Sequence, residues 1–165
     1  MVKPKFVIFL NSSQSVHDKI RPMISLALAR QLRAAGLKWT PAKNDFFVVP
    51  DRGLDEHVFV IGEMIVGMEK LDGQPVFSFQ GASEWALDYV MTGEALWLPA
   101  EAQMRQALEE QLRQTEPERF IQLTVMGDRY RCEIRHHRQP LTFEAGDAAE
   151  AYGAALIYVL THGVQ

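Results

Sequence analysis

The sequence predicts an α+β fold, with a mixed or antiparallel sheet, helices packed on it and a C-terminal ββ(β)α unit. Residues 46–79 contain runs of β-branched and aromatic residues separated by turn residues, which is typical of strands joined by short connections. The segments 120–126 and 130–136 flank Gly127-Asp128, a dipeptide that favours a two-residue hairpin turn. Apolar residues recur at helical spacing in other stretches of the chain.

The length and composition suit one domain, or one domain with a small appended lobe. The chain has 165 residues, of which 47% are hydrophobic, and this is enough to build a buried core. Proline and charged residues at 115–118 follow a predicted helix and precede a predicted strand, so we interpret them as a linker. We therefore expect a main α+β domain at 1–114 and a small ββ(β)α lobe at 119–165, packed against the first.

Charge and hydropathy restrict the partners and the compartment. The net charge of −4 offers no overall attraction to nucleic acid or anionic lipid. No stretch approaches the roughly 18 apolar residues of a transmembrane helix, so we expect no membrane partner. The single cysteine, Cys132, excludes an intramolecular disulfide and fits a reducing compartment. We expect a cytoplasmic protein in which Cys132 is a small packed residue rather than a nucleophile.

The first half of the chain predicts one helix and several strands. We expect a strand at 5–10, followed by a helix that ends near Ala35, with Gly36 as its stop. This helix starts at Ser13 or Ser15 or, as we prefer, near Arg21, where Pro22 falls in the first turn. Strands are predicted at 46–49, 57–61 and 76–79, and 64–71 is either strand or helix.

The central stretch, 83–112, predicts a helix, a short buried strand and a second helix. Ser83 is the expected N-cap of the first helix, which pairs Trp85 with Tyr89 and Ala86 with Val90 one turn apart. The apolar run 96–98 is too short for a helix, and Pro99 is expected to start the next one. We expect both Trp85 and Trp97 to lie in the core, and the second helix to bury Met104, Leu108 and Leu112.

The C-terminal unit carries the clearest local signals. Two strands flank the turn at Gly127, and 140–144 is a possible third strand. Asp147, with Glu150 three residues later, resembles a capping box at the start of the final helix. The residues expected to face inward on that helix are Tyr152, Ala155, Leu156, Val159 and Leu160.

Acidic residues are the only catalytic candidates. A pair of carboxylates could act as acid and base or as magnesium ligands if the fold brings them together. The candidates are Asp45, Asp51 and Glu63 from the strand region, which also holds Asp55 and Glu56, together with Glu84 and Asp88. The specific patterns of nucleases and pyrophosphatases, phosphate-binding loops and known metal-ligand spacings are missing, so the sequence predicts no cofactor and no metal site.

Histidines and arginines near the predicted C-terminal hairpin are candidate binding residues. His136 and His137 are adjacent on a predicted strand and should point to opposite faces, which disfavours a shared metal. Arg129, Arg131, Arg135 and Arg138 are expected to form a basic row. Such a row can bind phosphates or an acidic partner, or it can be the solvated side of a half-buried strand. Trp39 is a further candidate, either for binding or as a packing anchor at the edge of a sheet.

Several short motifs resemble those of a known protein family. Gly-Leu-x-Trp-x-Pro at 36–41, Glu-Trp-Ala-Leu-Asp at 84–88 and Leu-Trp-Leu-Pro at 96–99 resemble a family of small bacterial proteins, some of phage origin. Some of its members are labelled as pilus-assembly proteins, and the family implies no established activity. The resemblance extends from Ile24 to Leu112. The C-terminal unit is also similar, more weakly, to small antitoxin-like modules.

These observations favour a non-catalytic interaction or accessory protein. The chain is rich in aromatic residues but carries no catalytic motif, and a surface around Trp39 and Trp85 is the expected docking site for another protein or a second copy. The alternatives are a small carboxylate-based hydrolase or nucleotide-handling enzyme, and a nucleic-acid-binding module or pilus-assembly-related protein. The net charge disfavours nucleic acid as the partner.

Overall fold

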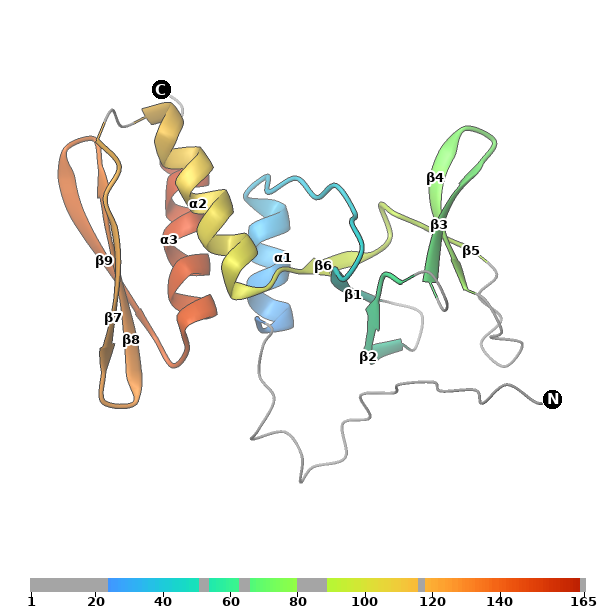
Figure 1. Ribbon diagram of the computed structural model, residues 1–165, viewed down its shortest axis with the longest axis horizontal. Coiled ribbons are helices and arrows are strands. Elements are labelled where there is room, and N and C mark those ends of the chain that lie inside the picture. The colour runs from blue at the N-terminus through green and yellow to red at the C-terminus, as the bar shows by residue number, and fades with distance from the viewer. Residues whose placement is uncertain (1–23, 51–53, 63–65, 80–88, 116–117, 164–165) are drawn as a thin grey trace. The chain divides into compact units, whose positions relative to one another are not determined.

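The computed structural model describes residues 24–50, 54–62, 66–79, 89–115 and 118–163 (Figure 1). These residues form an α+β fold of three helices and three sheets, each sheet with three strands. The described part of the chain divides into two compact units, one formed by 40–97 and the other by 24–39 and 98–163. The helix before the predicted linker lies in the same unit as the C-terminal strands.

The first unit contains two small sheets. One has the order β2-β1-β6 and is formed by β1 (Phe46–Val49), β2 (Leu54–Val60) and β6 (Leu96–Leu98). The other has the order β3-β4-β5 and is formed by β3 (Val66–Leu71), β4 (Gln74–Phe79) and β5 (Tyr89–Met91). The ambiguous segment 64–71 is therefore a strand over its described part. Asp72 and Gly73 form its hairpin turn with φ of 50° and 81°.

Aromatic residues join the two sheets of the first unit. The Phe47 ring of β1 stacks on Phe77 of β4, with 4.6 Å between ring centroids, and on Phe59 of β2 at 5.5 Å. Phe47 and Phe77 are completely buried. Buried valines complete this core: Val48, Val49, Val66, Val76 and Val90.

The second unit is a three-stranded antiparallel sheet with three helices. Its strands β7 (Ile121–Met126), β8 (Arg129–His136) and β9 (Gln139–Ala145) have the order β7-β8-β9. The helices are α1 (Leu26–Ala34), α2 (Glu101–Thr115) and α3 (Ala148–His162). Helix α3 contacts β8, β9, α1 and α2 (Figure 1). It is apolar on several faces because neighbours cover most of its circumference.

The predicted local signals in this unit are confirmed. Asp147 caps α3, since its side chain accepts a hydrogen bond from the Glu150 N–H at 2.8 Å. Gly127 adopts φ +64° in the β7–β8 turn. The predicted third strand exists as β9, and the α2 stripe is fully buried at Met104, Leu108 and Leu112. Of the inward residues predicted on α3, Leu160 is only half-buried.

Three predicted helix boundaries are wrong. Helix α1 begins at Leu26, after the predicted starts at Ser13, Ser15 or Arg21, because Ser25 caps it by accepting from the Leu28 N–H at 3.2 Å. The predicted helix from Ser83 does not reach Val90. Tyr89 and Val90 instead pair with β4, so pairing between strands overrides the helical spacing. Pro99 precedes α2, which begins at Glu101.

Other expectations fall outside the described residues. The strand predicted at 5–10, the beginning of the helix predicted from Ser83, and Trp85 are among them. Trp97 is half-buried between the buried Leu96 and Leu98, so it is less enclosed than predicted.

Candidate functional site

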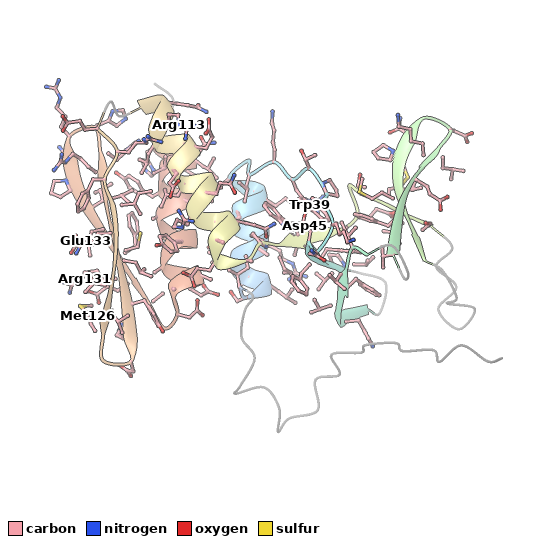
Figure 2. All side chains as sticks on the ribbon, in the orientation of Figure 1. Trp39, Asp45, Arg113, Met126, Arg131 and Glu133 are labelled. Carbon is pink, nitrogen blue, oxygen red and sulfur yellow. The ribbon has the colours of Figure 1, made fainter. Side chains whose placement is uncertain are left out.

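The catalytic candidates do not form a cluster among the described residues. Asp45 is 3% exposed, and its Oδ2 accepts a hydrogen bond from the Ala42 N–H at 2.9 Å (Figure 2). The Asp45 N–H donates to the Ala42 carbonyl at 3.1 Å, so the carboxylate closes the turn that leads into β1. The other candidates, Asp51, Glu63, Glu84 and Asp88, lie outside the described residues.

The described residues also contain no metal centre. No group of three or more His, Cys, Asp or Glu side chains in this part of the chain could hold a metal ion. His136 is buried at the end of β8, whereas His137 is exposed and adopts φ +49° in the following turn. Their ring centroids lie 4.1 Å apart in an edge-to-face contact. Tyr158 of α3 also meets the His136 ring edge-to-face, which is an aromatic packing arrangement.

Cys132 is a packed residue of β8. Its side chain is completely buried beneath α3, opposite Leu123 and Phe143 in the neighbouring strands. Burial, with a smaller contribution from the nearby Glu133 carboxylate, raises the pKa of the Cys132 thiol to about 11. The thiol is therefore protonated near neutral pH, and the structure offers no activated nucleophile at this position.

The arginine row lies on the outer face of the β7-β8-β9 sheet. Figure 2 shows Arg131 and Glu133 on the side of the sheet away from α3, and the strand alternation puts Arg129 and Arg135 on the same side. Arg138 was predicted to belong to the row, but it lies in the β8–β9 turn with φ +64° and not on the strand.

Acidic side chains compensate part of this row. Arg131 donates two hydrogen bonds to Glu144 Oε1, from Nε at 3.0 Å and from Nη2 at 2.8 Å. Glu144 Oε2 also lies 4.0 Å from Arg129 Nε, and Glu133 Oε1 lies 4.0 Å from Arg131 Nη1. The Arg135 guanidinium lies over the Phe120 ring at 5.7 Å. The face therefore offers mixed charges rather than a continuous track for phosphates.

The edge of β7 presents outward-pointing backbone groups that no sequence pattern indicates. The Arg135 N–H donates to the Phe120 carbonyl at 3.3 Å, and the pairing continues in register to Met126 opposite Arg129. In an antiparallel pair of strands, residue pairs that exchange backbone hydrogen bonds alternate with residue pairs that do not. The N–H and C=O groups of Ile121, Leu123 and Val125 therefore point away from β8. No other strand among the described residues pairs with this edge.

The two edges of the sheet differ in chemistry. The outer edge of β9 carries Pro140, which has no N–H to donate, and such a residue protects an edge from further pairing. Strand β7 contains neither proline nor a charged residue. Val125 is 63% exposed and Phe120 is 38% exposed. The β7 edge thus presents apolar side chains and backbone groups that pair with no other strand in the described ranges, and it is the best candidate functional site.

Trp39 gives less direct support for a binding surface. It is half-buried in the segment that follows α1, so part of its ring contacts the protein (Figure 2). This arrangement fits a packing anchor as well as a docking residue.

Comparisons with known proteins found no match to this chain among family models, curated proteins or solved structures. None of the helices in the described ranges is long and apolar enough to cross a membrane.

Proposed function

We propose that this protein is a non-catalytic interaction module that binds an extended partner segment at the edge of β7. The observation that carries the proposal is the set of outward-pointing backbone groups at Ile121, Leu123 and Val125. A partner strand that adds to such an edge gains main-chain hydrogen bonds, and its alternate side chains supply specificity. An apolar, uncharged edge is otherwise a site of uncontrolled pairing, so a partner that covers it also removes a hazard.

The side chains around this edge support the same role. Ile121, Leu123 and Val125 share the side of the sheet that faces α3, and α3 packs over β8 and β9. A partner strand beside β7 would add apolar side chains next to Val125, whose side chain is exposed. The hydrophobic contact would then be contiguous with the core of the second unit.

The alternative functions have weaker support in the geometry. A carboxylate-based hydrolase needs ionised groups that face a substrate, but Asp45 accepts a hydrogen bond within its own turn. A nucleic-acid-binding module needs uncompensated cations, but Arg131 is bound to Glu144. An accessory role in pilus assembly, which the family resemblance suggests, is compatible with an interaction module.

The test is selection of extended peptides on the purified protein. A random heptapeptide library is panned on the wild-type protein, and the affinities of selected peptides are then measured for two variants. Val125→Pro removes an outward N–H from β7 and leaves the β7–β8 hydrogen bonds in place. Thr142→Pro is the matched control, since Thr142 opposes Glu133 in the alternating ladder and its N–H points outward at the β9 edge.

We expect peptides with alternating apolar residues, and a loss of at least about tenfold in affinity for Val125→Pro but not for Thr142→Pro. Backbone NMR of the complex should show the Ile121, Leu123 and Val125 amides as the most perturbed. Peptides that bind all three proteins equally, or perturb amides elsewhere, would contradict the proposal.

A further inference from the structure

We propose that the partner at the β7 edge is a second copy of this chain, paired antiparallel through β7 with Leu123 on the two-fold axis. This inference rests on the proposed function of the edge and names its occupant. It follows from the order of side chains along β7, which is complementary to itself in this register.

The register places chemically matched residues opposite each other. Leu123 opposes Leu123 of the partner subunit, and Ile121 opposes Val125 of the partner subunit, so the side facing α3 gains an apolar stripe. On the outer side, Gln122 opposes Thr124 of the partner subunit, an amide opposite a hydroxyl. Within one chain these two side chains already lie 3.4 Å apart, from Gln122 Nε2 to Thr124 Oγ1, and they can exchange this contact for the equivalent one across the axis.

The hydrogen-bonding pattern fits the same register. Ile121, Leu123 and Val125 carry the outward N–H and C=O groups, and they are spaced symmetrically about Leu123. Each outward group therefore meets an outward group of the partner subunit. A shift of one residue would place outward groups of one strand opposite inward groups of the other, so it would lose these bonds.

The lack of charge on β7 and the protected outer edges of the resulting sheet favour a second copy of this chain over another partner strand. A two-fold axis places equivalent surfaces together, so a charged edge would repel itself, but residues 120–126 carry no charge. Pairing two β7 strands produces a continuous sheet of six strands whose two outer edges are both β9. Pro140 protects each of these edges. The assembly therefore stops at a dimer.

The first experiment is a measurement of mass in solution. Multi-angle light scattering and analytical ultracentrifugation of the full chain should give a dimer that dissociates on dilution. Val125→Pro should raise the dimer dissociation constant by at least about tenfold, and Thr142→Pro should leave it within about twofold. Circular dichroism of each variant verifies that the sheet remains folded.

The second experiment tests the register by cross-linking. Gln122→Cys and Thr124→Cys place thiols on the outer face, away from the buried Cys132. In the proposed register, residue 122 lies directly opposite residue 124 of the partner subunit, close enough for a disulfide. Two copies of the same residue, 122 with 122 or 124 with 124, are diagonal neighbours about 7–8 Å apart. Mild oxidation of the equimolar mixture should therefore give more covalent dimer than oxidation of either variant alone.

The outcomes separate the inference from the proposed function. A dimer that is insensitive to Val125→Pro, or cross-linking that does not depend on mixing, would overturn the β7 pairing. A wild-type monomer that still binds selected peptides at β7 would also overturn the second copy as occupant, while leaving the interaction module intact. A monomer that binds no peptide at this edge would overturn both.

Discussion

Gly153 of α3 and Leu28 of α1 lie so close that a Cβ atom added to Gly153 would stand 2.5 Å from Leu28 Cδ2. The same Cβ would lie 3.3 Å from Met104 Sδ of α2, so the glycine marks the point where the three helices meet. Glycine inside a helix ordinarily costs about 1 kcal/mol relative to alanine. Here the missing side chain permits the close approach of α1 and α3.

Gly153→Ala should lower the free energy of unfolding by about 1 kcal/mol. The added methyl group overpacks a buried contact at a cost of roughly 1–3 kcal/mol, which exceeds the gain in helix propensity of about 1 kcal/mol. Urea denaturation followed by circular dichroism measures the change. The control is the same substitution made in a Leu28→Ala variant, which lacks the side chain that the added methyl group contacts.

In the Leu28→Ala background, Gly153→Ala should raise the free energy of unfolding by up to about 1 kcal/mol, because the clash with Leu28 is gone and the flexible Met104 side chain, 3.3 Å from the added Cβ, can move aside. The specific expectation is therefore that Gly153→Ala destabilises the wild-type protein and stabilises the Leu28→Ala variant. Equal effects in both backgrounds would mean that the Gly153–Leu28 contact does not limit the helix packing.

The buried Cys132 thiol should make stability depend on pH in the alkaline range. Burial raises the pKa of Cys132 from its ordinary 9.0 to about 11 in the folded protein. Between these values the folded state holds a proton that the unfolded state has released, so the contribution of Cys132 to stability is constant below about pH 9 and falls as the pH rises toward 11. The total loss is at most roughly 3 kcal/mol.

Urea unfolding at several pH values measures this slope, with Cys132→Ala as the control. The variant should lose the decline just above pH 9. It should keep a decline above about pH 10 because burial, first among several causes, also raises the pKa of Tyr152 from its ordinary 10.0. The same slope in both proteins near pH 9.5 would mean that Cys132 titrates normally in the folded state.

Phe77→Ala should strongly destabilise the first unit. The Phe77 ring is completely buried against Phe47 of the other sheet, and truncation of a buried aromatic residue costs roughly 3–5 kcal/mol. Phe77→Leu, which keeps most of the apolar volume, should cost less, about 1–2 kcal/mol. Hydrogen exchange of the β1 and β4 amides is the measurement, since it reports opening of this unit separately from the second.

In the Phe77→Ala variant, these amides should exchange at least about a hundredfold faster, since roughly 3 kcal/mol corresponds to a factor above about 100, while those of β8 should change less. Similar acceleration in both units would show that they unfold together. Unchanged exchange in β1 and β4 would contradict a core that depends on the Phe47–Phe77 stack.

Local chemistry determined much of the second unit from the sequence. A hairpin at Gly127 and a helix cap at Asp147 depend on residues within a few positions of each other, so the predictions required no knowledge of the fold. The burial of Met104, Leu108 and Leu112 followed from helical periodicity alone. The α+β class followed from the same local patterns.

Contacts between distant segments decided the rest. Tyr89 and Val90 have helical spacing with their predecessors, yet they form a strand because β4 offers hydrogen-bond partners there. Arg131 belongs to a basic row in the sequence, but Glu144 lies directly opposite it on the neighbouring strand β9 and compensates its charge. Neither the strand at Tyr89 and Val90 nor the Arg131–Glu144 ion pair can be predicted from a short local segment of the sequence.

The candidate site shows the same division. The sequence predicted residues 120–126 as a strand and 140–144 as a possible third strand, because side-chain type and alternation can be read directly from the sequence. Which strand lies at the edge depends on the sheet order β7-β8-β9, and which backbone groups point outward depends on the register with β8. The tertiary structure alone decides these two properties, because a backbone hydrogen bond is satisfied or left open by the neighbouring strand and not by the residue that carries it.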